Sequence, residues 1–280
     1  MTLSSNTGRT GRFARLFAAL SAKHELAFVP FVNLCDPTPE ISAEILETLV
    51  RAGADALELG IPFSDPTADG PVLEESAHRA LDAGATVAKC FELVRKLRES
   101  HPELPISIMA YVNLAAVKGP EDFFARAAAA GADAVLLPDV PISMRLAEPL
   151  WDEAAEKAGI DMAAIAPPNA ADDVLEEAAK RSGSYTYLLS RAGTTGEDRA
   201  AGHSSPHSIG VLKKAGAAPL LLGFGVSAPK HVEEARAMGA DGVIVGSAIG
   251  SIIEQHLDDK AKLLEELARY ARGMKAATKR

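Results

Sequence analysis

The sequence is poor in several features that define whole classes of protein. Only two of its 280 residues, Cys35 and Cys90, are cysteines, which argues against a disulfide scaffold or a structural zinc site and suits a reducing compartment. No stretch approaches the roughly 18 consecutive apolar residues of a membrane span. The net charge is −9 and there is no long basic block, which argues against nucleic acid as the main partner. We therefore expect a cytoplasmic globular protein.

The rest of the composition provides ample material for a core, since 48% of the residues are hydrophobic and 24% are charged. The first 20 residues contain Ser, Thr and Arg, as a transit peptide would. We favour a disordered tail over residues 1–10, followed by an amphipathic helix from about Gly11 with Phe13 and Phe17 on its apolar face. No interval resembles a linker, so we expect residues 1–280 to form one domain.

One phrase recurs along the chain. AGADALELG (52–60), AGADAVLLPD (130–139) and MGADGVIVGS (238–247) each follow a helical run and lead into a short apolar run. The glycine fits the left-handed cap that ends a helix, and the apolar run fits a parallel strand buried on both faces. A repeated unit of helix, glycine cap and buried strand is typical of a parallel α/β fold.

Counting every such apolar run predicts eight strands, which indicates a (β/α)8 TIM barrel with an extra N-terminal helix. A doubly wound sheet is the competing architecture, but it rarely uses eight evenly spaced units without a second domain. The predicted strands are residues 26–32, 56–60, 106–111, 134–138, 162–166, 185–190, 220–224 and 243–247. Active sites of such barrels lie at the carboxyl ends of the strands.

An acidic residue stands inside the second predicted strand. Because side chains alternate along a strand, Ala56, Glu58 and Gly60 share one face, and this small set suits the barrel interior. Burial raises the pKa of a carboxyl group towards neutrality, which is the condition for a general acid or base. The alternative is an ion pair with a buried Arg or Lys; no strand interior offers one, and Arg191 stands just past the sixth strand.

Two more carboxylates occupy the loop after that strand. Asp65 precedes Pro66 and fits a turn former. For Asp69 the spacing leaves two interpretations open: a functional carboxylate, or the cap of a helix that begins at Gly70 or Pro71.

The loops after the last three strands have a different chemistry. Residues 191–203 contain glycines and hydroxyls and predict a mobile lid. GFG (223–225) and GSAIG (246–250) end the last two strands and each leads into a helix, which is the usual phosphate site of a barrel, although each alone would fit a plain turn. The strands contain no lysine, and the histidines fall outside them. We expect acid–base chemistry on a phosphorylated small molecule, without a metal or a covalent intermediate.

The stretch ALELGIPFSDPTADGP (56–71) closely resembles the signature of the tryptophan synthase alpha subunit family. The resemblance continues in the expected order through AFVPFVNLCDP, YVNL, DVP, APPN, TYLLSRAGTTG, GFGVS and GSAIG, and so covers nearly the whole chain. It implies a (β/α)8 barrel that cleaves indole-3-glycerol phosphate to indole and glyceraldehyde 3-phosphate. That reaction is a carbon–carbon lyase step of tryptophan biosynthesis.

The resemblance also implies a role for individual residues. Glu58 would protonate indole C3 and assist loss of the hydroxyl proton, and Asp69 would bind the indole N–H. In the lid, Thr195 would bond Asp69 on closure. The implied substrate-binding residues are Phe31, Tyr111, Ile165, Tyr187, Thr195, Phe224 and Ile244. The implied phosphate-binding residues are Gly196, Gly225, Gly246 and Ser247.

The family forms an αββα heterotetramer in which indole passes through a tunnel to a beta subunit that carries pyridoxal phosphate. By resemblance, this chain itself needs no cofactor. Thr67 stands where the family usually has leucine, and Cys35 stands where glycine usually precedes Asp36; both departures concern partner binding more than proton transfer. Two alternatives stay open: a stand-alone lyase that releases free indole, and a non-catalytic barrel that binds the phosphate ligand and regulates another subunit.

Overall fold

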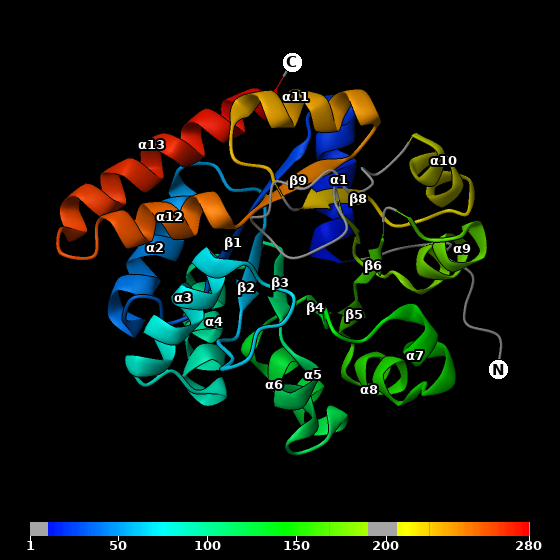
Figure 1. Cartoon of the computed structure of the whole chain (residues 1–280), viewed down its shortest axis with the longest axis horizontal. Helices are drawn as coiled ribbons and strands as arrows, with labels where there is room; N and C mark the ends of the chain where they lie inside the picture. Colours follow the sequence, from blue (N-terminus) through cyan, green and yellow to red (C-terminus); the bar gives the residue numbers. More distant parts are fainter. Residues whose placement is uncertain (1–10, 168, 190–205, 224, 280) are drawn as a thin grey trace.

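The structure is a computed structural model that describes residues 11–167, 169–189, 206–223 and 225–279. Within them, nine short strands form one parallel sheet in the order β5-β4-β3-β2-β1-β9-β8-β7-β6, surrounded by helices (Figure 1). The predicted tail (1–10) and lid (191–203) lie outside the described residues. The strands are β1 (Ala27–Asn33), β2 (Leu57–Gly60), β3 (Ile106–Met109), β4 (Ala134–Leu136), β5 (Asp161–Met162), β6 (Ala164–Ala166), β7 (Thr186–Leu189), β8 (Leu220–Gly223) and β9 (Gly242–Val245).

Helices alternate with the strands and cover the outside of the ring, as Figure 1 shows. They are α1 (Arg12–Ala22), α2 (Pro39–Arg51), α3 (Pro71–Asp82), α4 (Val87–Ser100), α5 (Val112–Ala116), α6 (Pro120–Ala130), α7 (Ile142–Ala147), α8 (Leu150–Ala158), α9 (Asp172–Arg181), α10 (Pro206–Lys214), α11 (Pro229–Met238), α12 (Ser247–Gln255) and α13 (Lys260–Thr278). The predicted (β/α)8 barrel is therefore confirmed, with further short helices between some strands.

The two ends of the sheet meet at the fifth predicted strand, which the structure divides into β5 and β6 with Ala163 between them. β5 pairs with β4, and β6 pairs with β7. The N–H of Ala163 donates to the carbonyl of Val135 at 3.0 Å. The carbonyl of Ala163 accepts instead from Nη1 of the buried Arg145, at 3.2 Å. The covalent chain at Ala163 thus closes the ring, and a side chain from α7 satisfies its carbonyl.

Strand alternation separates the barrel interior from the layer under the helices. Leu57 and Leu59 belong to the large outer core with the helices, whereas Ala56 belongs to the inner cluster. The inner cluster also contains Phe13 and Phe17 of α1, and the ring of Phe13 lies 5.5 Å from that of Tyr185, which directly precedes β7. Helix α1 therefore covers the amino-terminal mouth of the barrel (dark blue in Figure 1), and the predicted amphipathic helix is confirmed.

The glycine and the aspartate of the recurring Gly-Ala-Asp phrase each have a structural role. Gly131 and Gly239 end α6 and α11 in the left-handed conformation, with φ of 91° and 89°, as predicted. The aspartate of each phrase accepts the backbone N–H at or next to the start of a neighbouring strand: Asp55 from Phe28, Asp133 from Ile106 and Asp241 from Leu220. The glycine therefore ends a helix, and the aspartate links adjacent strands by a hydrogen bond at the amino-terminal end of the barrel.

A buried polar cluster joins the loop after β1 to α3, the helix that follows the Asp69 loop. The fully buried Asp36 accepts two hydrogen bonds from Arg79 at 3.0 Å each and one from the Ser76 hydroxyl at 2.6 Å. Asn33, at the end of β1, donates to the carbonyl of Leu73 at 3.0 Å. These bonds fix the first turns of α3 and so the far end of the loop that carries Asp69.

Candidate active site

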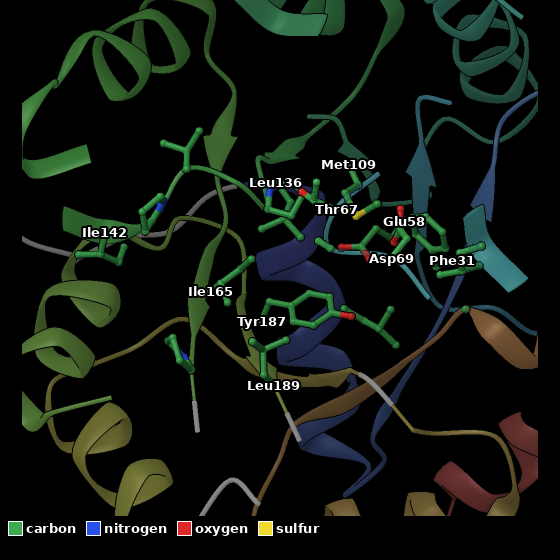
Figure 2. A pocket seen from close by; sticks show the side chains of 18 of the residues that line it. Phe31, Glu58, Thr67, Asp69, Met109, Leu136, Ile142, Ile165, Tyr187 and Leu189 are labelled. Atoms are coloured by element: carbon green, nitrogen blue, oxygen red, sulfur yellow. The ribbon is translucent and has the colours of Figure 1, made fainter. Parts of the chain in front are cut away.

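A cavity of about 930 Å³ opens at the carboxyl ends of the strands. Most of the residues that line it are apolar, and the carboxylates of Glu58 and Asp69 lie close together on one side (Figure 2). Tyr187, Ile165 and Leu189 form a neighbouring part of the wall (Figure 2). On the side of α7 and α9 the cavity is lined by Ile142, Leu146, Val174 and Glu177. The cavity therefore offers an apolar surface beside the carboxylates of Glu58 and Asp69, and three further acidic residues line it: Asp173, Glu176 and Glu177.

Glu58 lies in β2 with 1% of its surface exposed. The hydroxyl of Tyr185, which comes from the opposite part of the barrel, donates to its Oε1 at 2.5 Å. Burial raises the pKa of Glu58 to about 7; the bond from Tyr185 works against this rise, and the charge of Asp69 adds to it. Among the described residues its partner is a tyrosine rather than a cation, and Arg191 lies outside them. Glu58 can therefore exchange a proton near neutral pH.

Asp69 is held on its loop by Tyr111. The hydroxyl of Tyr111 donates to Oδ2 of Asp69 at 3.1 Å and accepts the N–H of Ala68 at 3.0 Å. Burial raises the pKa of Asp69 to about 6, the bond from Tyr111 opposes this, and the charge of Glu74 adds to it. The N-cap of α3 is Gly70, so the capping interpretation of Asp69 is wrong. The expectation that Asp69 has a functional role beside Glu58 therefore stays open.

The ring of Tyr187 packs against the backbone of Gly223 in the neighbouring strand β8, where there is no side chain. A Cβ built on Gly223 of β8 would lie 2.1 Å from the Tyr187 hydroxyl oxygen, so a side chain there would displace the ring. Burial raises the pKa of Tyr187 well above its ordinary value, and its hydroxyl stays protonated at neutral pH. Gly223 therefore shapes the wall of the cavity as well as the strand end.

The part of the cavity next to β8 and β9 is built from backbone rather than from large side chains. Gly225 follows β8 with a φ of 77°, in the left-handed region that favours glycine. Helix α12 begins at Ser247 with Gly246 as its N-cap, and all three residues line the cavity. Unpaired N–H groups at a helix N-terminus suit an anion, so this end of the cavity fits a phosphate.

The arrangement as a whole suits a flat apolar molecule with an anionic end, held beside two carboxylates that titrate near neutrality. Within the described ranges, no group of three or more His, Cys, Asp or Glu side chains could hold a metal ion. Among the described helices, none is long and apolar enough to cross a membrane. The two carboxylates, with pKa values of about 7 for Glu58 and about 6 for Asp69, suit acid–base chemistry by the chain's own side chains.

The chain as a whole is similar to known proteins. The family model for the tryptophan synthase alpha chain matches residues 17–279. This chain belongs to that family. Tryptophan synthase alpha chains from Photobacterium profundum and Corynebacterium diphtheriae are 50% and 48% identical to it, over 268 and 279 residues. The matches cover 96% of this chain and 98% and 99% of the two relatives.

Solved structures agree with this assignment. The tryptophan synthase alpha subunit from Legionella pneumophila is similar with a TM-score of 0.85 and 28% identity, covering 96% of this chain and 98% of that one. A chain of the tryptophan synthase a2b2 complex from Pyrococcus furiosus is similar with a TM-score of 0.77 and 30% identity, covering 90% and 98%. The tryptophan synthase alpha family cleaves indole-3-glycerol phosphate, so the lyase activity expected from the sequence is confirmed.

The structure brings most of the predicted site residues to the same cavity. The predicted residues that line it are Phe31, Glu58, Asp69, Ile165, Tyr187, Gly225, Ile244, Gly246 and Ser247. Tyr111 lies differently, because it contacts Asp69 and is not among the described lining residues. Thr195, Gly196 and Phe224 lie outside the described residues.

The two positions that depart from the tryptophan synthase alpha pattern have distinct surroundings. Thr67 lines the cavity, two residues before Asp69. Cys35 has a φ of 71°, in the region where a Cβ is strained and glycine is favoured. The backbone conformation accounts for the glycine that the family usually has there.

Tyr185 and Ser107, the two hydroxyl residues behind Glu58, are not among the site residues predicted from the sequence. The oxygen atoms of their side chains lie 2.8 Å apart, and both residues are buried. A signal was available, because alternation puts Tyr185 on the same strand face as Tyr187, and Ser107 is the polar residue of the apolar strand β3.

Proposed function

We propose that this chain cleaves indole-3-glycerol phosphate with Glu58 as acid and base and with Asp69 as the partner of the indole nitrogen, in an αββα complex with a beta subunit in the cytoplasm. The observation that carries the residue assignment is the pair of carboxylates, the buried Glu58 and the half-buried Asp69, that face one largely apolar cavity. Neither carboxylate has a cation partner among the described residues.

The reaction needs one group that first gives a proton and then takes one back. Protonated Glu58 delivers its proton to C3 of the indole ring, which becomes an indolenine cation. The carboxylate left on Glu58 then accepts the proton of the side-chain hydroxyl while the bond between C3 and that carbon breaks. The bond's electron pair returns to the ring, which leaves indole and the aldehyde, and Glu58 is protonated again.

Asp69 stabilises the charge that appears in the first step. Its carboxylate accepts a hydrogen bond from the indole N–H, and this bond strengthens as the ring becomes cationic. The hydroxyl of Tyr111 holds this carboxylate in place. The ring itself serves as the electron sink, so the proposed cleavage uses no cofactor in this chain.

The remaining contacts position the substrate. The indole ring lies among Phe31, Ile165, Tyr187 and Ile244, which line the cavity. The phosphate binds at Gly225, Gly246 and Ser247, where the N-terminus of α12 favours negative charge. The apolar contacts hold the indole ring next to the two carboxylates, and the glycines and Ser247 hold the phosphate at the carboxyl ends of the strands.

The proposed partner is a tryptophan synthase beta subunit, which binds pyridoxal phosphate and consumes the indole. Similarity to a chain of the Pyrococcus furiosus a2b2 complex supports this. The loop that carries Asp69 and Thr67 is the part of the site that the partner reorders. A biosynthetic family and an ordinary composition with two cysteines support the cytoplasm as its location.

Release of indole from indole-3-glycerol phosphate tests the proposal. We expect slow release by the purified chain and a rise of about tenfold or more when a beta subunit is added, which is the usual size of coupling between sites. Rapid release that the beta subunit does not change would favour the stand-alone lyase. Substrate binding without release in either condition would favour the non-catalytic barrel and refute the proposal.

The pH dependence of the cleavage is a second test. Glu58 begins the reaction protonated, so activity falls as the pH rises through its pKa of about 7. Asp69 acts ionised, so activity falls as the pH drops through its pKa of about 6. We expect kcat/KM to follow a narrow bell-shaped pH profile. Because kcat/KM reports the pKa values of the free enzyme, the midpoints of both limbs should lie within about one pH unit of these values. A flat profile from about pH 5 to about pH 9 would contradict both assignments.

A further inference from the structure

Three buried hydroxyl and carboxyl groups form a chain across the barrel interior. Ser107, Tyr185 and Glu58 are each 1% exposed. The Ser107 Oγ and Tyr185 Oη atoms lie 2.8 Å apart, and Tyr185 Oη lies 2.5 Å from Oε1 of Glu58. Ser107 is also the direct register partner of Glu58, on the adjacent strand β3. Two neighbouring strands and the residue that precedes a third strand, β7, therefore hold the three groups in fixed positions.

The direction of the hydrogen bonds follows from the proton count. A tyrosine hydroxyl has a single proton, and Tyr185 uses it on the carboxylate of Glu58. The hydroxyl of Ser107 must then donate to the oxygen of Tyr185. Successive donors polarise one another, so the outer bond strengthens the inner one.

We propose that Ser107 is a positioning residue for Glu58, acting through Tyr185 as the outer donor of this chain. The inference rests on the function proposed above. Within the described part of the chain, Oε1 is the oxygen of Glu58 that accepts a hydrogen bond. The chain of donors therefore fixes Oε1 and leaves Oε2 to carry the proton that is delivered to the substrate.

The groups around Glu58 indicate that the hydrogen bonds from Ser107 through Tyr185 affect the pKa of Glu58 and not that of Asp69. The titratable groups that face Glu58 are Asp69, from the loop after β2, and Tyr185 and Tyr187, from the β7 segment. Tyr185 is the group that stabilises the ionised form of Glu58 and lowers its pKa. Loss of the Ser107 hydroxyl weakens this donor, so the pKa of Glu58 rises. Asp69 is held by Tyr111 instead, so its pKa stays where it is.

The test is the pH profile of kcat/KM, measured on the complex with a beta subunit, for Ser107→Ala, Tyr185→Phe and the double variant. Because protonated Glu58 starts the reaction, a higher pKa moves the basic limb to higher pH and leaves the acidic limb in place. We expect a shift of about 0.1–0.3 pH unit for Ser107→Ala, because an outer hydrogen bond strengthens the inner one by roughly 10–30%. For Tyr185→Phe we expect about one unit, since that change removes a hydrogen bond to the charged group itself.

A matched control and a rescue separate positioning from a general packing effect. Ser42→Ala removes another fully buried serine hydroxyl, which contacts the backbone N–H of Cys35 rather than Glu58; its profile is expected to match that of the unaltered chain. Ser107→Thr restores the hydroxyl, and its basic limb is expected to return. In the Tyr185→Phe background, Ser107→Ala is expected to add no further shift, because the link to Glu58 is already gone.

Two results would overturn the proposal while leaving the proposed function intact. One is an active Ser107→Ala variant whose basic limb is unmoved. The other is a shift from Ser107→Ala that is equally large with and without Tyr185, which would mean that the serine acts by another route. If the unaltered complex releases no indole, the proposed function fails and this inference fails with it.

Discussion

Replacement of Glu58 by glutamine is expected to reduce indole release by about a thousandfold, the size of effect typical of a lost general acid–base group. The amide has the shape of the carboxyl group but carries no acidic proton for C3 and does not accept the hydroxyl proton. Tyr185 still has an oxygen to which it can donate, so the fold and substrate binding are retained. The measurement is kcat for indole release in the complex, together with the dissociation constant of the substrate in the inactive variant.

Glu99→Gln is the matched control for this change. Glu99 is exposed on α4 and pairs with Arg95, on the outside of the barrel. The control is expected to release indole at the rate of the unaltered chain. A Glu58→Gln variant that keeps more than about a tenth of the activity would show that another group transfers the proton.

Replacement of Asp69 by asparagine is expected to lower kcat by about a hundredfold, the usual cost of removing one electrostatic stabiliser of a transition state. The amide carries no charge to balance the indolenine cation. The acidic limb of the pH profile should disappear, because the group that titrates with a pKa of about 6 is gone. The basic limb should move to lower pH, because the charge of Asp69 contributes to the raised pKa of Glu58.

Asp65→Asn is the matched control for Asp69→Asn. It changes a carboxylate of the same loop that does not line the cavity. Asp65 is exposed and is bonded to the hydroxyl of Ser64. Its variant is expected to keep both limbs of the profile. If Asp69→Asn kept its acidic limb unchanged, that limb would belong to a different group and the role assigned to Asp69 would be wrong.

Local sequence pattern was sufficient for much of this fold. The repeated Gly-Ala-Asp phrase predicts helix ends and strand starts within a few residues, because glycine caps and doubly buried strands depend on near neighbours. Alternation placed Glu58 on the inner face with Ala56, which the inner cluster confirms for Ala56. A carboxylate on that face is costly to ionise, so the sequence also predicts its raised pKa.

Contacts across the barrel could not be predicted in the same way. Tyr185 is 127 residues from Glu58, and their meeting depends on the register of every strand between them. The bond from Tyr111 to Asp69 depends on the path of an irregular loop, for which spacing carries no period. The division of the fifth strand at Ala163 depends on a guanidinium from α7. Each of these features is set by tertiary structure.

The part of the cavity next to α7 and α9 bears on redesign of the substrate range. Leu146 and Val174 line it and are 47% and 38% exposed, so shortening them removes little buried surface and leaves no closed void. Leu136 and Ile244, at the centre of the wall, are almost fully buried, and shortening them would cost packing energy. We therefore expect bulkier indole analogues to be accommodated at a lower cost in stability by shortening Leu146 or Val174 than by shortening Leu136 or Ile244.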